Sequence, residues 1–201
     1  PHDTPRFEQL LGDGSRWGMR IGYAVQARPG GVAQSLIVAE PFLQAEPCAL
    51  VLGDNLFYGQ NLVRQMRYAY GQKKGATVFA YSVANPQAYG VLELNSEGTV
   101  IGVEEKPAQP KSKQAVTGLY FFDGQAAEIA KGLSPSARGE LEITDVIRTY
   151  LTMGQLEVQH MGRGQAWLDT GTADSLLDAA NFIQTIERRQ GLKVSCPEEI
   201  A

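Results

Sequence analysis

Cys48-Ala-Leu-Val-Leu-Gly-Asp54-Asn55 is the most informative stretch of this sequence. Its first five residues are apolar, and such a short unbroken run predicts a fully buried strand. The run ends at Gly-Asp-Asn, which places a carboxylate just beyond the carboxyl end of that strand. In open α/β sheets this end faces the crevice where ligands bind. A carboxylate there can hold a hard divalent cation against a phosphate.

A second aspartate, Asp169, occurs late in the chain, within Ala166-Trp-Leu-Asp-Thr-Gly171. Two such acids indicate a metal-dependent site for a phosphorylated ligand, because two carboxylates with waters and phosphate oxygens complete an octahedral Mg2+ shell. The alternative for each acid is a turn aspartate that caps the backbone after it. His2 and His160 are interpreted as surface or packed residues, and no Cys/His spacing typical of zinc occurs.

The composition is that of one globular domain. The chain has 201 residues, of which 43% are hydrophobic, and this is ample for a sizeable core. A formal net charge of −4 without a basic run argues against a nucleic-acid surface. No apolar stretch reaches bilayer length, and Cys48 and Cys196 are expected to be reduced thiols of a cytosolic protein.

Strand and helix patterns alternate along the chain, which predicts an α/β fold with a mostly parallel central sheet flanked by helices. Two apolar runs around Asn95-Ser-Glu-Gly98 predict an antiparallel hairpin insert. We also expect a strand over residues 19–25 and a helix over residues 32–42. The last helix is expected to begin after the N-cap Thr172 and to end near Gln190.

Seven segments occur in an order that resembles the sugar-nucleotide pyrophosphorylase family, most closely its glucose-1-phosphate thymidylyltransferases. They are Val25-Gln26 with Gly31–Gln34, Leu52–Asn55, Tyr89–Val91, Glu104–Pro107, Val116–Tyr120, Gly139–Asp145 and Trp167–Gly171. The resemblance implies a Rossmann-like nucleotidyltransferase fold. It also implies a Mg2+-dependent enzyme that forms dTDP-glucose and pyrophosphate from dTTP and glucose 1-phosphate, for the synthesis of deoxysugar and polysaccharide precursors.

The resemblance assigns catalysis to Asp54, Lys106 and Asp169, with the two aspartates as Mg2+ ligands. It assigns recognition of the nucleotide base to Gln26 and Gly31. The amide of Gln26 offers a donor and an acceptor to a pyrimidine edge, and a glycine at 31 lets the backbone approach the base closely. Taken without the resemblance, this stretch is more typical of a strand end and a loop.

The sugar phosphate is assigned by the same resemblance to residues of four segments: Asn55, Tyr89, Gly90, Glu105, Lys106 and Val116. Glu105 would accept hydrogen bonds from sugar hydroxyls, and Lys106 would neutralise the phosphate. The alternative for residues 104–106 is a solvated charge cluster. Residues 138–142 are interpreted as a structural or oligomer contact without chemistry, and Arg163 as a turn residue.

The resemblance further implies a cytoplasmic homo-oligomer, a homotetramer, with neither nucleic acid nor membrane as a partner. Three alternatives stay open: transfer of a uridylyl group or to another sugar 1-phosphate, a non-catalytic nucleotide-sugar binder, and a glycosyltransferase of similar α/β design. The last requires an Asp-x-Asp metal motif, which does not occur in the sequence.

The ends of the chain depart from the family pattern. Members open with a strand and the loop Gly-Gly-x-Gly-Thr-Arg-Leu, followed by a phosphate-binding lysine, and nothing here matches that loop. The chain begins at Pro1 in what resembles the middle of the nucleotide-binding half, and it stops at Pro197–Ala201 where relatives continue. We therefore expect a single, partial nucleotidyltransferase domain over residues 1–201 that is not a competent catalyst alone.

Overall fold

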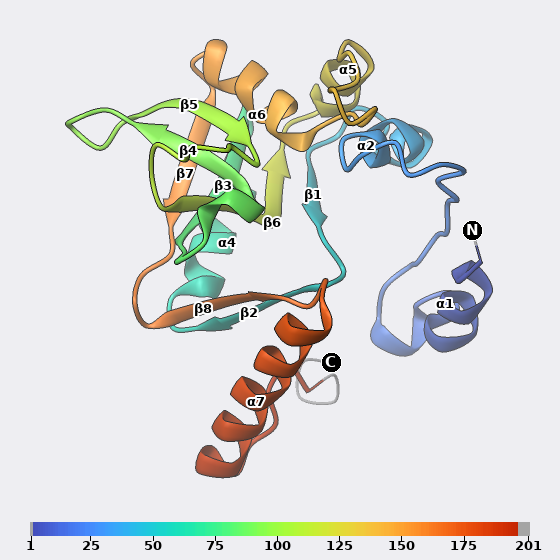
Figure 1. Cartoon of the computed structure of the whole chain (residues 1–201). Coiled ribbons are helices and arrows are strands. Elements are labelled where there is room, and N and C mark those ends of the chain that lie inside the picture. Colours follow the sequence, from blue (N-terminus) through green and yellow to red (C-terminus); the bar gives the residue numbers. More distant parts are fainter. Residues whose placement is uncertain (1, 197–201) are drawn as a thin grey trace. The chain divides into compact units, whose positions relative to one another are not determined.

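The computed structural model describes residues 2–196 (Figure 1). It divides the chain into two compact units. Residues Gly30–Asp169 form one, called here the central unit, and Pro1–Pro29 with Thr170–Ala201 form the other, the flanking unit. Pro1 and residues 197–201, on which the expectation about the chain ends rests, lie outside the described residues.

The central unit is built on a six-stranded mixed sheet of order β5-β4-β6-β3-β7, with β1 also paired to β6. Only β3 and β7 run parallel, and every other described pair in this sheet is antiparallel. The strands are β1 (Cys48–Val51), β3 (Ala76–Ser82), β4 (Gly90–Leu94), β5 (Val100–Glu105), β6 (Gln114–Phe122) and β7 (Leu156–His160).

The α/β architecture is as predicted, but the expectation of a mostly parallel sheet is wrong for the described residues. Strands β4, β5 and β6 follow one another without a helix between them, and short connections return the chain antiparallel. Alternating patterns along a sequence do not determine which strands become neighbours. The predicted hairpin is confirmed, since β4 pairs with β5 and the Asn95 side chain accepts the backbone N–H groups of Glu97 and Thr99.

Hydrophobic clusters cover both faces of this sheet. One joins it to α2 (Gln34–Val38), α5 (Ala126–Lys131) and α6 (Ile143–Thr152). The other joins it to α4 (Leu62–Gly71) and to residues of a second sheet. Strand β3 shows the division, because Val78 and Ala80 belong to the first cluster and Phe79 between them to the second, as the pleat of a strand requires.

The second sheet has two antiparallel strands, β2 (Asn55–Gly59) and β8 (Gln165–Asp169) (Figure 1). The sequence pattern did not predict it. Its register sets Asn55 opposite Asp169. The first acidic stretch and the second, more than 100 residues apart in sequence, therefore meet at one end of this sheet.

The helix expected over residues 32–42 is broken in two. Helix α2 ends at Val38, and the short α3 (Glu40–Leu43) starts a new turn from Ala39. Pro41 explains the break, because it has no backbone N–H to donate to the carbonyl of Ile37.

In the flanking unit, the last helix is as predicted. Helix α7 (Ala173–Gln190) begins with Thr172, whose side chain forms a capping box with Ser175, and ends at Gly191 in the left-handed conformation. No helix within residues 2–196 has the length and apolar character needed to cross a membrane.

The strand predicted over residues 19–25 does not form. After α1 (Thr4–Leu11) and a 3-10 turn, η1 (Ser15–Trp17), this stretch is irregular. It folds back on the preceding residues instead, because the Tyr23 hydroxyl donates to the carbonyl of Gly12 at 2.7 Å and the N–H of Ile21 donates to that of Asp13 at 2.8 Å. These bonds replace the sheet partner that a strand would need.

Candidate active site

The candidate site lies where the neighbours of β6 separate. One edge of β6 pairs with β3, whereas its other edge pairs with β4 at Ala115 and with β1 only from Leu119 onward. Between these two pairings, residues 116 and 117 face a gap, and the Gly118 carbonyl accepts the N–H of Leu52, just after β1, at 2.9 Å. A cavity of about 330 Å3 occupies this region of the central unit.

Eight of the ten site residues predicted from the sequence line this one cavity. They are Asp54, Asn55, Tyr89, Gly90, Glu105, Lys106, Val116 and Asp169. They come from the loop after β1, from β2, β4, β5, β6 and β8, and from the short η2 turn (Pro86–Ala88) and its flanks. Only the tertiary fold brings these segments together.

The two predicted metal ligands each accept a hydrogen bond from a neighbouring side chain. Asp54 Oδ1 accepts from Asn55 Nδ2 at 2.7 Å, and Asp169 Oδ2 accepts from the Tyr89 hydroxyl at 2.6 Å. Burial, together with the hydrogen bond to the Asp169 carboxylate, raises the pKa of Tyr89 to about 12. Tyr89 therefore keeps its proton at neutral pH and remains the donor.

The donor set suits Mg2+ only in part. Within residues 2–196, no group of three or more His, Cys, Asp or Glu side chains is arranged to hold a metal ion. Asp54 and Asp169 supply carboxylate oxygens on one cavity, which is the ligand type that Mg2+ prefers. Mg2+ commonly binds through one or two carboxylates together with substrate phosphates and water, so the pair fits a site that is completed by the substrate.

Glu105 is the last residue of β5, Lys106 follows it directly, and both line the same cavity. Lys106 has a φ of 43°, and its N–H donates to the carbonyl of Tyr89 at 3.0 Å, which ties β5 to the turn before β4. Burial raises the pKa of Glu105, and the charge of Glu142 raises it further, while Lys106 and Arg138 oppose the shift. Because its ionised form is disfavoured, the Glu105 carboxylate would be stabilised by an additional hydrogen-bond donor.

The space around residue 90, at the cavity, leaves no room for a side chain. A Cβ at this position would lie 2.6 Å from the Thr144 methyl group and 3.3 Å from a carboxylate oxygen of Glu105. Its φ is not in the left-handed region, so the requirement is one of space.

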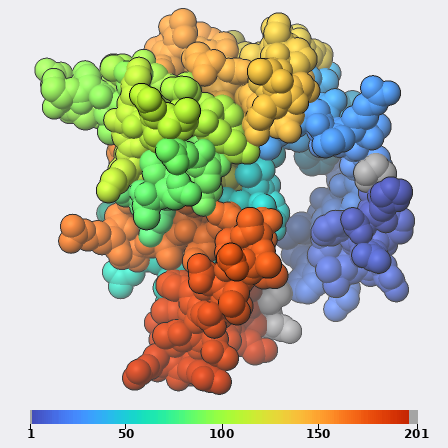
Figure 2. Space-filling model, viewed as in Figure 1, coloured from blue at the N-terminus to red at the C-terminus, as the bar shows by residue number. Residues whose placement is uncertain are grey.

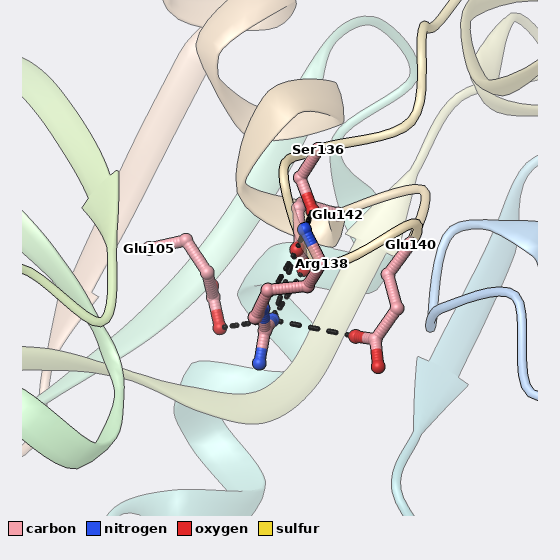
Figure 3. A network of polar contacts seen from close by, with 5 residues as sticks. All are labelled: Glu105, Ser136, Arg138, Glu140 and Glu142. Atoms are coloured by element: carbon pink, nitrogen blue, oxygen red, sulfur yellow. Dashed lines mark hydrogen bonds and ion pairs between the residues drawn. The ribbon is translucent and has the colours of Figure 1, made fainter.

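Arg138 lies at the centre of an ion-pair network beside Glu105 (Figure 3). Its Nη2 atom is 2.8 Å from Glu142 Oε2, 3.3 Å from Glu140 and 3.4 Å from Glu105 Oε1. The Glu142 side chain is only 8% exposed and Ser136 also donates to it, so Arg138 is firmly placed. The sequence analysis assigned no chemical role to residues 138–142. The signal available there was a single arginine close to two glutamates.

The two residues predicted to recognise a base lie in different units. Gln26 belongs to the flanking unit, where it lines a hollow of about 560 Å3 made by residues 3–29 themselves. Gly31 belongs to the central unit, with a φ of +96°, and a Cβ there would lie 2.3 Å from the Leu141 carbonyl oxygen. The described contacts thus explain the glycine at 31 by backbone packing.

Trp167 and Gly118 also line the cavity, and sequence reasoning assigned neither a role. Trp167 is 9% exposed and packs its ring edge-on against Tyr89, with ring centroids 4.9 Å apart. A tryptophan two residues before the second aspartate was the signal available in the sequence.

A larger hollow of about 640 Å3 lies between the β4–β5 hairpin and α6. Figure 2 shows the surfaces of the hairpin, in green, and of α6, in orange, meeting there. Two of its charged groups are paired, Lys111 with Glu93 and Arg148 with Asp145, and no predicted site residue lines it. The smaller cavity is therefore the candidate site.

Comparison with known proteins shows the family and the fold. The family model described as nucleotidyl transferase matches residues 1–186. The chain belongs to the nucleotidyl transferase family. Within that family it is 54% identical to the glucose-1-phosphate thymidylyltransferase of Xanthomonas campestris pv. campestris, over all of this chain and 68% of that relative. It is 55% identical to that of Mycobacterium tuberculosis, over all of this chain and 69% of the relative.

Solved structures of nucleotidyl transferases show the same fold. A Bacillus anthracis protein proposed to be a glucose-1-phosphate thymidylyltransferase is 38% identical, with a TM-score of 0.79 over 89% of this chain and 71% of that one. A UDP-glucose pyrophosphorylase bound to UDP-glucose is 23% identical, with a TM-score of 0.74 over 90% of this chain and 73% of that chain. The second likeness concerns the fold alone.

Proposed function

We propose that the protein catalyses thymidylyl transfer from dTTP to glucose 1-phosphate. A phosphate oxygen of glucose 1-phosphate attacks the α-phosphorus of dTTP, the bond to the β-phosphate breaks, and dTDP-glucose and pyrophosphate form. The observation that carries the proposal is the convergence of eight predicted residues on one cavity in a chain 54% identical to a thymidylyltransferase. Catalysis of this kind needs positioning and charge neutralisation rather than a protein nucleophile.

Asp54 and Asp169 are proposed to hold Mg2+ at one part of the cavity. When bound, the ion would polarise phosphoryl oxygens and offset the charge that develops on them. The protein's own contribution is orientation: Asn55 and Tyr89 each donate a hydrogen bond to one of the two carboxylates. Because the pKa of Tyr89 is raised to about 12, its donated proton stays in place at neutral pH.

Glu105 and Lys106 are proposed to bind the acceptor. Lys106 supplies a compact positive charge for the phosphate of glucose 1-phosphate. Glu105 accepts hydrogen bonds from sugar hydroxyls, which compensate its burial. Arg138, placed against Glu105 by Glu142, adds a second cation beside this position. Asn55, Gly90 and Val116 complete the proposed sugar-phosphate site.

Gln26 and Gly31 are proposed to recognise the base, with support from the matching segments and from the thymidylyltransferase relatives. We also propose one nucleotidyltransferase domain for both units, because the family match runs from residue 1 to 186 across them. Homo-oligomeric assembly, as a homotetramer, is a further proposal, which light scattering after size-exclusion chromatography would test.

The test is pyrophosphate release with Mg2+ and glucose 1-phosphate, comparing dTTP, UTP, dATP and dGTP. It is run on residues 1–201 with and without the upstream segment of a close relative, which also checks the expectation that residues 1–201 are not competent alone. We expect a pyrimidine nucleotide to be used and purines to be rejected, because a site built to hydrogen-bond one base leaves polar groups unpaired with another. The Asp54→Asn variant serves as the inactive control. Use of a purine nucleotide as efficient as that of dTTP contradicts the base assignment, and higher kcat/KM for UTP would make the protein a uridylyltransferase.

A further inference from the structure

The side chain of Asn55 makes three hydrogen bonds at the candidate site. Its Oδ1 atom accepts from the Trp167 indole Nε1 at 2.6 Å and from the Gly118 backbone N–H at 3.1 Å. Its Nδ2 atom donates to Asp54 Oδ1 at 2.7 Å. One amide thus connects β6, β8 and the proposed metal-binding loop.

The two donors determine which way this amide points. An indole N–H and a backbone N–H can only donate, so both require the amide oxygen of Asn55. The reversed amide would place its own N–H groups against both donors. Since an amide oxygen has two lone pairs, these bonds use its acceptor capacity, and the NH2 group is left facing Asp54.

Gly118 makes this arrangement sterically possible. A Cβ at that position would lie 2.4 Å from Asn55 Oδ1 and 2.8 Å from the Leu52 side chain. The φ of Gly118 is not in the left-handed region, so the backbone itself does not demand glycine. The bare Cα therefore serves the approach of the Asn55 amide to β6.

Trp167 supports the second carboxylate as well. Its ring packs edge-on against Tyr89, whose hydroxyl donates to Asp169. The same indole thus braces Asn55 through its N–H and Tyr89 through its ring. Each of these neighbours in turn donates to one of the two aspartates.

We propose that Asn55 is a positioning residue that aims the Asp54 carboxylate at the metal, and that Trp167 is the common brace of both proposed metal ligands. This inference rests on the proposed function. This role is additional to the sugar-phosphate contact proposed above: the amide oxygen is engaged by Trp167 and Gly118, and one of the two N–H groups of the amide donates to Asp54. Donors that orient metal ligands typically change metal affinity by about 10–100-fold when removed.

The chain offers a direct spectroscopic readout, because it contains only two tryptophans, Trp17 and Trp167. The indole N–H signal of Trp167 can be assigned in a 1H–15N spectrum by its persistence in Trp17→Phe. Titrating Mg2+ into the protein in the presence of dTTP, without glucose 1-phosphate, should shift this signal beyond the change that dTTP alone produces, because the indole connects through Asn55 to Asp54. Thymidylyl transfer is measured in parallel.

Asn55→Ala should weaken the apparent Mg2+ affinity about tenfold and lower kcat about tenfold. Because Asn55 also belongs to the proposed sugar-phosphate site, its effect on metal binding is measured without glucose 1-phosphate. Gly118→Ala should produce the same pattern, because the added methyl displaces the Asn55 amide, and it should add little to Asn55→Ala. Trp167→Phe keeps a ring against Tyr89 but removes the indole N–H, so it should show a smaller loss of Mg2+ affinity.

Asn95→Ala is the matched control. The Asn95 oxygen also accepts two backbone N–H groups, but in an exposed hairpin turn outside the cavity. This variant should lose some stability and keep wild-type Mg2+ affinity and kinetics. A fold check by circular dichroism accompanies every variant.

Three outcomes would overturn the inference. The first is a folded Asn55→Ala protein with wild-type Mg2+ affinity. The second is a raised KM for glucose 1-phosphate with unchanged Mg2+ affinity, which would make Asn55 a sugar-phosphate ligand only. The third is an active wild-type protein whose Trp167 signal does not respond to Mg2+ in the presence of dTTP. A protein that responds to Mg2+ as described but releases no pyrophosphate contradicts the proposed function instead.

Discussion

Asp123 and Glu105 are two largely buried acids whose surroundings shift their pKa values in opposite directions. Asp123, 6% exposed, follows β6 at the end far from the cavity. Burial acts to raise its pKa, but hydrogen bonds outweigh burial and lower it. The donors are the Tyr150 hydroxyl, the N–H of Gly75, and the backbone and side chain of Gln125.

Glu105, with 22% of its side chain exposed, lines the cavity and has its pKa raised. Burial is the main cause, and the nearby Glu142 adds repulsion that Lys106 and Arg138 do not cancel. Asp123 therefore stabilises the fold, whereas Glu105 is available to a ligand. A satisfied carboxylate stabilises the apo protein, whereas a destabilised one at a cavity gains from a bound partner.

The largest expected effect is a loss of activity when the aspartates of the cavity are substituted. Asp54→Asn and Asp169→Asn, both at the cavity, should each lower turnover by at least about 100-fold, because each removes a charged ligand oxygen of the proposed metal site. Their unfolding free energies should stay close to wild type. Initial rates against Mg2+ concentration and urea denaturation provide the two measurements. Near-native rates for either variant would refute the two-aspartate site.

Tyr150→Phe, next to Asp123, should lower stability and leave activity unchanged. It removes the buried hydroxyl that donates to Asp123 at 2.7 Å and leaves that carboxylate one donor short. The free energy of unfolding should fall by about 2 kcal/mol, as for hydrogen bonds to charged groups, with kcat/KM unchanged. Tyr68→Phe, on the exposed side of α4, is the control and should change neither quantity. An inactive but stable Tyr150→Phe protein would contradict the division between the two regions.

Lys106→Ala should raise KM for glucose 1-phosphate about tenfold, as expected for losing one charged partner of a phosphate. KM for dTTP should change less than about twofold. Lys111→Ala, outside the cavity, is the matched control and should leave both values unchanged. Steady-state kinetics with each substrate varied in turn decide the matter, and equal losses for both substrates would argue against a role specific to the acceptor.

The smallest expected effect concerns pH. Because the pKa of Glu105 is raised in the folded protein, its ionisation costs stability as pH rises from the ordinary value of 4.5 through the folded value. Glu105→Gln does not titrate, so its unfolding free energy relative to wild type should rise across that window and level off above it. Glu97→Gln, in the exposed hairpin turn, is the control. A stability difference that is the same at every pH would contradict the proposed state of Glu105.

Local signals explain the elements that were predicted well. Thr172 and Gly191 bound α7 because a capping side chain and a left-handed glycine act within a few residues. The hairpin at Asn95 is likewise a local structure. The strand expected over residues 19–25 failed because a strand requires a partner, and its pattern does not specify one.

The features of the candidate site also fall into those that the sequence predicts and those that it does not. The chemical groups could be predicted from the sequence: carboxylates after apolar runs, a lysine beside a glutamate, and small residues where the chain packs closely. The direction of strand pairing, the β2–β8 sheet, the gap along β6 and the Arg138 network required the tertiary structure. So did the orientation of the Asn55 amide. The physical reason is the separation along the sequence over which each interaction acts. Residue type and near neighbours set local conformation, whereas hydrogen bonds between residues more than 100 positions apart form only when the chain has folded.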